Sequence, residues 1–520
     1  MPFPDPEGLL ETAYHDLQAF LQAGSVPLDG TFRIVTGHNE DLPKEAYRVR
    51  TLKTECRIEA ADTEGIRRAI FHVEDEMLRR EGPFLPLGTV EREPVIRTRL
   101  SRCFFGPIKR PPRNRDELTD DVDYYPDHYL NRLAHEGVNG LWLTVAWKDL
   151  CRTNVFPECG SDADRRLEKL RRTVQKCRRY GIRIYTFFIE PAAFEADDPL
   201  LEKYPQLAGN QRNGHVNFCP ASELGKRYIR EAVSFLFTQV PNLGGILNIS
   251  VGERPTHCAS GAVDTINCPR CSERDPCDVL ADVLQAMKEG VHAVAPEAEV
   301  ISWPYSQYTC WGEDRTAEAA GRLPKDVMLQ HNFESTGRIR QLGQLRDVRD
   351  YSLAYPGPSE LFKRCAENAV GAGNRMSAKL QVGCSHEVAT VPWVPVPGLL
   401  YEKYQAMHRL GVSGAMQSWY FGNYPSLMTR AAGDLSFAAF PEGTNRNRVI
   451  VMLSDGEQHR GNPLRTAEVA GAAGVPVFTV TIGSEAGSTI PLPDGSRLTD
   501  ESGNAVLTRA DPRILAEIAE

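Results

Sequence analysis

The chain of 520 residues contains no long run of apolar side chains. A membrane-spanning helix needs about 20 consecutive apolar residues, and no segment approaches that length. The first residues, MPFPDPEGLLETAY, also lack the basic start and short apolar stretch of a secretory signal. These absences predict a cytoplasmic protein that does not insert into a membrane.

A sustained excess of basic side chains is absent as well. Lys and Arg total 60 against 69 Asp and Glu, so the formal net charge is −9. The one basic cluster, between residues 165 and 179, alternates with apolar residues at helical spacing, which is typical of the outer face of an amphipathic helix. Nucleic-acid binding depends on neutralising phosphates, so this charge balance argues against a nucleic-acid partner.

Cysteine is present in an odd number, 13, and without an export signal we expect mostly reduced thiols. Four of them are close in the sequence: Cys258, Cys268, Cys271 and Cys277. Thiolates spaced in this way can bind one tetrahedral zinc ion, which would be structural because four thiolates leave no position for water. A loop of free or redox-paired thiols is the competing interpretation, and a catalytic thiol is a third.

The length exceeds that of one hydrophobic core and predicts several domains. Residues 1–92 contain short strands of period-two patterning and an amphipathic helix, which predicts a small α/β module. Residues 93–441 then repeat a pattern of apolar strand, polar loop and helix. The expected strands are Arg97–Phe105, Gly140–Val145, Arg183–Ile189, Gly245–Val251, Glu299–Trp303, Val327–His331, Ala378–Gly383 and Gly414–Trp419.

Eight such units are the number expected for a (β/α)₈ barrel, which places the chain in the α/β fold class. A doubly wound open sheet is the competing topology. It is disfavoured because no Gly-rich nucleotide loop follows an early strand.

Residues 442–520 no longer follow the repeat of strand, loop and helix seen in the barrel region. Their pattern predicts a strand, a helix and a second strand. The strand ending in Ser454-Asp-Gly-Glu resembles the second half of a von Willebrand factor A domain, in which such a turn helps to hold a metal. Those domains begin with a strand that carries Asp-x-Ser-x-Ser, and this motif occurs nowhere in the chain. A hard cation needs about six oxygen ligands, so we expect a half-domain without the metal function.

In a (β/α)₈ barrel, residues just beyond the carboxyl ends of the strands converge on the substrate. These positions are rich in carboxylates, histidines and aromatic side chains, which suit the hydroxyl groups and apolar faces of sugars. Some of the aromatic residues can instead cap the barrel core. The predicted substrate-binding residues are Trp147, Glu190, Arg254, His331, His386, Trp419 and Tyr420.

Two glutamates are the candidate catalytic groups. Glycosidic bonds are usually broken by two carboxyl groups, one acting as acid and the other as nucleophile or base. Glu253 follows strand four and Glu387 follows strand seven, so both would face the mouth of the barrel. This placement resembles that of the catalytic carboxyl groups in many retaining glycosidases with the same fold. The resemblance implies that Glu253 is the acid/base and that Glu387 is its partner. Either residue could instead be a surface residue or a salt-bridge partner.

The small module followed by a barrel resembles the layout of family 20 β-N-acetylhexosaminidases. In that family the acid follows strand four in a Gly-Gly-Asp-Glu segment, and here Val251-Gly252-Glu253 ends the strand. The resemblance implies that Glu253 is the acid, while Gly252 stands where the family has the Asp that orients the substrate's acetamido group. Substrate assistance would then need another carboxylate, such as Glu190 or Glu387.

The sequence therefore predicts a glycosidase that acts on β-linked glycosides, with N-acetylhexosaminides among them, and that requires no cofactor for catalysis. An oligosaccharide or glycoside is the expected partner. Two alternatives stay open: a non-catalytic carbohydrate-binding barrel, and an interaction protein that acts through the von Willebrand A-like segment.

Overall fold

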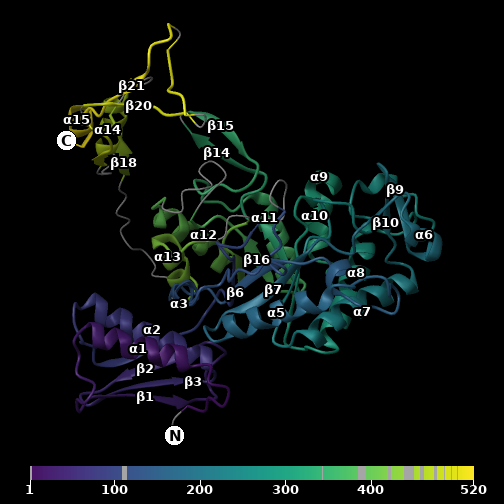
Figure 1. Cartoon of the computed structure of the whole chain (residues 1–520), viewed down its shortest axis with the longest axis horizontal. Coiled ribbons are helices and arrows are strands. Elements are labelled where there is room, and N and C mark those ends of the chain that lie inside the picture. The colour runs from purple at the N-terminus through teal and green to yellow at the C-terminus, as the bar shows by residue number, and fades with distance from the viewer. Residues whose placement is uncertain are drawn as a thin grey trace. The chain divides into compact units, whose positions relative to one another are not determined.

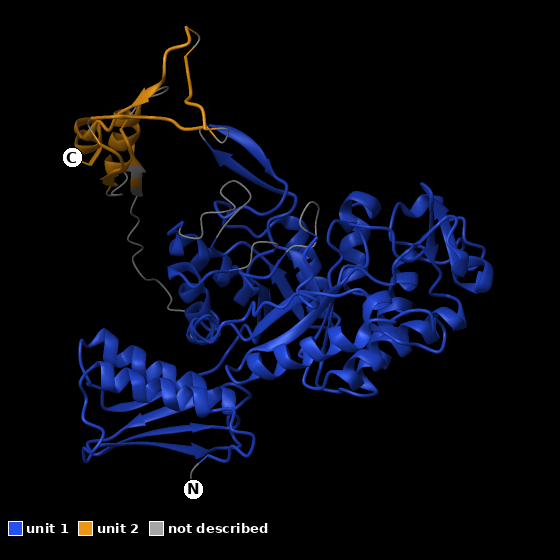
Figure 2. Cartoon of the chain, in the orientation of Figure 1, with its two compact units in different colours: residues 1–440 blue, residues 441–520 orange. Residues whose placement is uncertain are grey.

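The computed structural model describes residues 3–107, 114–341, 343–383, 394–419, 423–438, 450–456, 462–472, 477–484, 486–492, 495–500 and 502–519. The chain forms two compact units, residues 1–440 and 441–520 (Figure 2). Among the described residues, no helix combines the length and apolar character needed to cross a membrane.

The first unit begins with a small α/β module. Its sheet has the strand order β1-β3-β2-β4, and two helices cover one face of the sheet (Figure 1). The strands are β1 (Arg33–His38), β2 (Tyr47–Thr51), β3 (Glu55–Ala60) and β4 (Gly88–Arg92), and the helices are α1 (Glu11–Ala23) and α2 (Thr63–Arg79). The predicted module is confirmed, with α1 and the exposed strand β4 as additions.

A closed barrel of eight parallel strands follows the module, in the order β11-β12-β13-β16-β17-β5-β6-β7. This closure confirms the predicted (β/α)₈ barrel over an open sheet. Its strands are β5 (Thr98–Arg102), β6 (Gly140–Thr144), β7 (Arg183–Phe188), β11 (Gly245–Asn248), β12 (Glu299–Ser302), β13 (Val327–Asn332), β16 (Met376–Lys379) and β17 (Gly414–Met416).

Helices alternate with these strands and cover the outside of the barrel (Figure 1). They include α3 (Asp127–His135), α5 (Ala163–Arg178), α7 (Glu223–Gln239), α8 (Pro276–His292), α10 (Glu313–Ala320), α11 (Glu360–Gly371), α12 (Pro397–Arg409) and α13 (Leu427–Leu435). Several begin at a side chain that accepts a hydrogen bond from the first turn, as Ser222 does for α7 and Ser359 for α11.

The two faces of each barrel strand pack into different cores. On β7, Tyr185 and Phe187 belong to the cluster that fills the barrel, whereas Ile184 and Phe188 belong to the core between strands and helices. The alternation follows from the period of two along a strand. It decides which residue at a strand's carboxyl end faces the mouth and which faces the helices.

Two insertions lie at the carboxyl ends of the strands. Between β7 and α7 the chain forms a small antiparallel sheet of order β8-β10-β9, in which β8 is Phe194–Glu195, β9 is Ala208–Arg212 and β10 is His215–Phe218. Between β13 and α11 it forms the hairpin of β14 (Gly337–Gln341) and β15 (Gln344–Val348). Both insertions contribute side chains to the sites described below.

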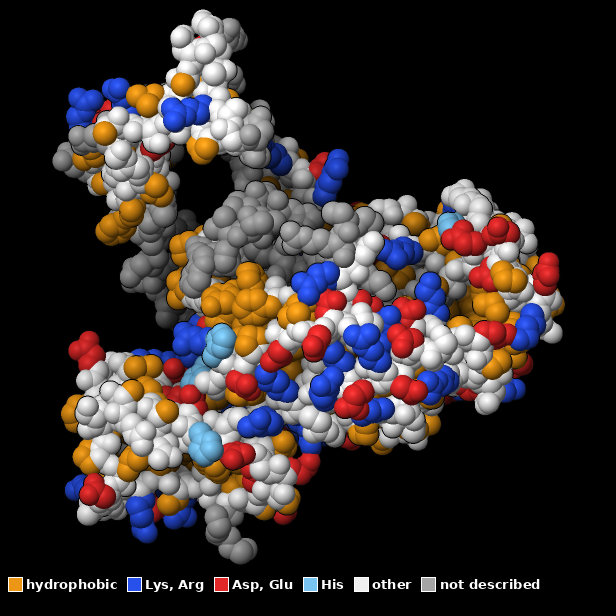
Figure 3. Space-filling model, viewed as in Figure 1, with side chains coloured by type: hydrophobic (Ala, Val, Ile, Leu, Met, Phe, Trp, Pro, Cys, Tyr) orange, Lys and Arg blue, Asp and Glu red, His pale blue; other side chains and the backbone are white. Residues whose placement is uncertain are grey.

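Helix α5 carries the basic cluster noted in the sequence. Its basic side chains have acidic neighbours: Arg171 lies 2.7 Å from Glu168, and Lys176 lies 2.6 Å from Asp123. Figure 3 shows acidic and basic side chains interspersed on this face of the molecule. The cluster is thus the charged outer face of an amphipathic helix, as predicted.

The second unit contains the predicted strand, helix and strand. Strand β18 (Ile450–Ser454) pairs in parallel with β19 (Val477–Thr481), and α14 (Pro463–Ala472) lies between them in the chain. The described remainder comprises the short pair β20 (Ser488–Thr489) and β21 (Leu507–Thr508), and the helix α15 (Pro512–Ala519). The resemblance to a von Willebrand factor A domain stays a prediction.

Candidate active site

Aromatic side chains fill the barrel interior toward the carboxyl ends of its strands. The ring of Trp419 lies 4.6 Å from that of Trp303 and 5.0 Å from that of Trp142, centroid to centroid. Tyr305 and Tyr351 pack at the same end, and their hydroxyl groups share a hydrogen bond. The predicted residue Trp419 therefore lies at the mouth of the barrel, where it is 2% exposed.

A buried polar network adjoins these rings and was not predicted. Asp350 Oδ2 accepts hydrogen bonds from Asn332 Nδ2 and from Lys379 Nζ, each at 3.1 Å. Lys379 Nζ also lies 3.3 Å from the centroid of the Tyr351 ring, and Asn332 Oδ1 accepts from Trp303 Nε1 at 2.8 Å. The network therefore connects a carboxylate and an ammonium group directly to the aromatic mouth.

Glu253 lies in the loop that follows β11, the fourth barrel strand in the chain, and its side chain is half-buried. Besides burial, the charges of Glu253 and Asp350 both contribute to the raised pKa of the Tyr351 phenol. Burial is the largest cause, followed by the charge of Asp350 and the Tyr305 phenol, and Glu253 contributes through its charge as well. Both carboxyl groups thus lie within electrostatic reach of one phenol at the mouth.

Gly252, which precedes Glu253, has a backbone conformation that suits glycine. Its φ is +92°, in the left-handed region that side chains rarely adopt, and a Cβ there would lie 2.6 Å from the backbone N and C of Ser306. A side chain at this position would force the loop after β12 away. The local backbone therefore disfavours any side chain, a carboxylate included, at position 252.

Glu190 has its carboxyl group engaged by backbone donors. Its Oε1 accepts from the N–H of Trp147 at 3.0 Å and its Oε2 from the N–H of Ala192 at 2.6 Å. Burial raises its pKa to about 7. Just beyond the end of β7, Ile189 packs against the barrel interior, and Glu190 points to the opposite side. Glu190 thereby holds the loop between β6 and α5, and its contact with substrate stays a prediction.

His331 and Trp147 also lie on the outer side of the barrel. The His331 ring packs toward Phe362 of α11, and burial lowers its pKa to about 4. Trp147 is fully buried against Phe188 and Tyr228. The strand and loop geometry turns both side chains into the layer between strands and helices, and their contact with substrate stays a prediction. Asn332, one residue after His331, is the side chain that faces the mouth.

The remaining predicted site residues divide into two groups. Arg254 is exposed and follows Glu253 in the chain. Its role in substrate binding stays a prediction. His386, Glu387 and Tyr420 lie outside the residues that the structure describes, so their roles stay predictions.

A second buried ion pair supports the network around Asp350. Glu334 Oε1 accepts from Lys403 Nζ at 2.6 Å, and neither side chain is exposed. Lys403 also donates to the backbone oxygen of Ser352, and Glu334 accepts from the N–H of Gln381. The pair thereby joins α12 to the loop residues that follow β13, β15 and β16.

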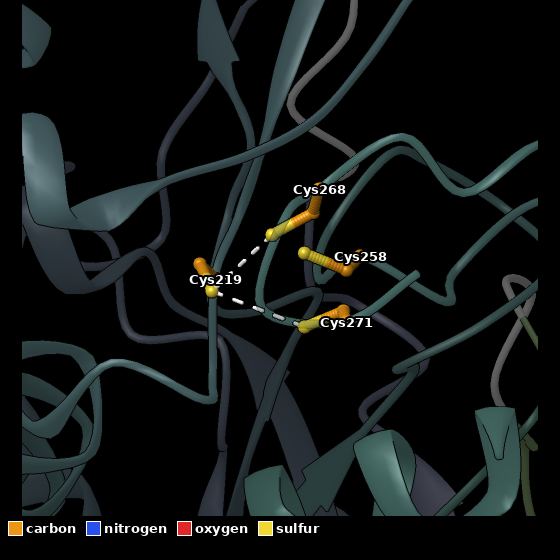
Figure 4. Close-up of side chains that lie close together, drawn as sticks. All are labelled: Cys219, Cys258, Cys268 and Cys271. Atoms are coloured by element: carbon orange, nitrogen blue, oxygen red, sulfur yellow. Dashed lines mark hydrogen bonds between the residues drawn. The ribbon is translucent and has the colours of Figure 1, made fainter. Parts of the chain in front are cut away.

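The cysteine cluster forms with one change from the prediction. Cys258, Cys268 and Cys271 meet Cys219, which directly follows β10 (Figure 4). Cys277, the predicted fourth member, lies in the first turn of α8 and does not belong to this group. The correction arises because Cys219 is distant in sequence and is brought in by the small sheet β8-β10-β9.

The chain matches no family model and no curated protein. Among solved structures it is similar to a GH138 enzyme targeting pectin rhamnogalacturonan II, with a TM-score of 0.57 and 15% identity over 83% of this chain and 50% of that chain. What the two share is the fold. The chain spans half the length of that GH138 enzyme.

Weaker likenesses include two further enzymes. The chitobiase of Flavobacterium johnsoniae has a TM-score of 0.48 and 10% identity, over 84% of this chain and 65% of that chain. A GH20 exo β-N-acetylglucosaminidase from Vibrio harveyi has a TM-score of 0.42 and 13% identity, over 80% and 65% of the two chains.

Proposed function

We propose that the protein is a glycoside hydrolase that acts on β-linked glycosides, with Glu253 as the general acid/base. The observation that carries the proposal is the place of Glu253, a half-buried carboxyl group after the fourth strand of a closed barrel, at an aromatic mouth. Residues at this end of a (β/α)₈ barrel are the ones that meet the substrate. The fold shared with the GH138 enzyme supports the same class of reaction.

The mouth has the chemistry that a sugar requires. Trp303 and Trp419 are buried beneath the half-buried Tyr305, whose ring offers apolar surface. The half-buried carboxylate of Asp350, held by the buried Asn332 and Lys379, offers a hydrogen-bonding group. Glycoside hydrolysis needs only two carboxyl groups and a water molecule, so the proposed reaction requires no cofactor.

Two residues compete for the role of the second carboxyl group. Glu387 is the residue predicted from its place after strand seven. Asp350 is favoured by its position, because it acts on Tyr351 together with Glu253 and is held by Asn332 and Lys379. With glycine at 252, substrate assistance also requires one of these two groups to orient an acetamido substituent.

Hydrolysis of nitrophenyl β-glycosides tests the proposal. The panel contains N-acetylglucosaminide, N-acetylgalactosaminide, glucoside and galactoside, together with rhamnogalacturonan II oligosaccharides because the GH138 enzyme is described as targeting that polymer. We expect turnover of at least one compound, and a loss of about 10²–10⁴-fold in kcat in Glu253→Gln, as for removal of a general acid. Glu273→Gln, an exposed glutamate of the same loop, should retain activity.

Hydrolysis that survives in Glu253→Gln would contradict the assignment. Glycan binding without hydrolysis in the unaltered protein would identify a carbohydrate-binding barrel instead. Comparing Asp350→Asn with Glu387→Gln then identifies the second carboxyl group. Where the nucleophile is lost, azide restores turnover and forms the α-glycosyl azide, whereas rescue of an acid/base variant forms the β-glycosyl azide. Inversion at the anomeric carbon, seen by proton NMR, would exclude either residue as a nucleophile.

A further inference from the structure

Four buried cysteines from two separate parts of the chain meet at one point. Cys219 follows β10, and Cys258, Cys268 and Cys271 lie in the long loop between β11 and α8. Each is at most 1% exposed. Their sulfur atoms point toward one another in Figure 4, and all four lie within 4.8 Å of each other.

Two local backbone features bring the four cysteines together. Phe218 and His257 form a parallel bridge, in which the N–H of Phe218 donates to Thr256 and the N–H of Cys258 donates back to Phe218. The bridge places Cys219 beside Cys258. In the Cys268-Pro-Arg-Cys271 segment, the N–H groups of Cys271 and Ser272 both donate to the Cys268 carbonyl, at 3.0 and 2.8 Å. This tight turn directs the second pair of sulfurs to the same side.

The sulfur separations match a single tetrahedral ion. Cys219 Sγ lies 3.7 Å from Cys268 Sγ and 3.9 Å from Cys271 Sγ. Zinc–sulfur bonds of about 2.3 Å in a tetrahedron place neighbouring sulfurs about 3.8 Å apart. A disulfide would require about 2.05 Å, and all four cysteines are free.

The surroundings also suit a negatively charged centre. Arg270 Nε donates to Cys219 Sγ at 3.1 Å, and the same guanidinium group is fixed by the backbone oxygens of Gln206 and Ala208. Four thiolates and one divalent zinc carry a net charge of −2, which a neighbouring cation partly offsets. In metal sites, the side chains that bind the ion are usually oriented by hydrogen bonds from neighbouring groups, as Cys219 is by Arg270.

We propose that Cys219, Cys258, Cys268 and Cys271 bind one structural zinc ion. Binding releases the four thiol protons as four zinc–sulfur bonds form, and no position is left for water, so the metal takes no part in hydrolysis. The ion ties the insertion before α7 to the loop that carries Glu253. This proposal stands whether or not the barrel is a glycosidase.

Metal analysis of the full-length protein, purified without chelator, tests the site. We expect about one zinc per chain by inductively coupled plasma mass spectrometry. In Cys219→Ser the zinc content should fall at least tenfold, because one of four ligands is lost. Cys277→Ser is the matched control, since this buried thiol lies in the adjacent helix α8 outside the cluster, and it should retain the full zinc content.

A second measurement on the unaltered protein covers the case in which Cys219→Ser does not fold. A mercurial reagent should release one zinc, detected by a chromogenic chelator, as the cluster thiols react, and cobalt exchanged into the site should show the visible absorption of a tetrahedral thiolate complex. Protein without bound metal, protein that contains iron instead of zinc, or an equal loss of zinc in Cys277→Ser would each overturn the proposal.

Discussion

At the scale of single residues, strand alternation determines which polar side chains reach the barrel mouth. Glu190 and His331 have the residue types that bind sugars, yet His331 lies on the outward side of β13, and Glu190, just beyond the end of β7, also points outward. Ile189 and Asn332, their neighbours, lie on the inward side. A shift of one residue along a strand therefore exchanges a substrate-facing side chain for one that packs under a helix.

Gly252 permits a test at the same scale. Gly252→Ala combines an unfavourable φ with contact against the Ser306 backbone, and we expect it to lower the free energy of unfolding by about 1–3 kcal/mol or more. Gly252→Asp, which adds a carboxylate at this position, should be destabilised similarly rather than gain activity. Urea unfolding measures both variants.

Gly214→Ala is the control for Gly252→Ala. Gly214 has a similar φ of +79°, but a Cβ there meets nothing within 4 Å. The difference between the two alanine variants therefore isolates the contact with Ser306. Equal destabilisation of the two variants would show that this contact does not restrict position 252.

At the scale of elements, buried ion pairs hold the inserted hairpin against the barrel. The pair of Glu334 and Lys403 joins α12 to the loops after β13 and β15, next to Asp350 and Tyr351. Two charges in the core are stable only while they remain paired and hydrogen-bonded. The placement of the Asp350 network therefore depends on a helix far from it in sequence.

Lys403→Met tests this dependence. It leaves Glu334 buried without its cation, and we expect a loss of about 3–5 kcal/mol in the free energy of unfolding. The double variant Glu334→Gln/Lys403→Met should recover much of that loss. Lys363→Met, which removes an exposed pair with Glu360, should cost about 1 kcal/mol or less. A loss in Lys403→Met no greater than that of Lys363→Met would contradict the interpretation.

At the scale of the first unit, the N-terminal module and the barrel meet through titratable groups. Glu74 of α2 lies 3.6 Å from His135 of α3, whose other nitrogen contacts Asp16 at 2.5 Å. Burial, then the charges of Asp16 and Asp75, raises the pKa of Glu74 to about 8. The folded protein therefore favours the protonated form of the Glu74 carboxyl group over its ionised form.

The raised pKa predicts how stability changes with pH. A group whose folded pKa exceeds its unfolded value stabilises the fold below the unfolded pKa and loses that contribution as pH rises through the folded pKa. Between about pH 5 and 8, Glu74 should thus lower the free energy of unfolding by at most about 1.4 kcal/mol per pH unit. Glu74→Gln should flatten this slope in urea titrations. Glu40→Gln, at an exposed glutamate, should not, and an unchanged slope in Glu74→Gln would contradict the prediction.

The sequence alone was sufficient for the architecture, because eight apolar strands alternating with amphipathic helices leave few ways to bury their surfaces. It also placed Glu253 after the fourth strand and Trp419 at the mouth, since both follow directly from where strands end. These features depend on local pattern, which the order of residues contains.

Only the tertiary structure decided which side chains share a site. Cys219 joins the thiol cluster through a bridge between β10 and a loop about 40 residues later, as the pairing of Phe218 with His257 shows. Asp350 reaches the mouth on an inserted hairpin, beside Lys379 from another strand. Contacts of this kind arise from folding segments that are distant in sequence against each other, and no local periodicity encodes them.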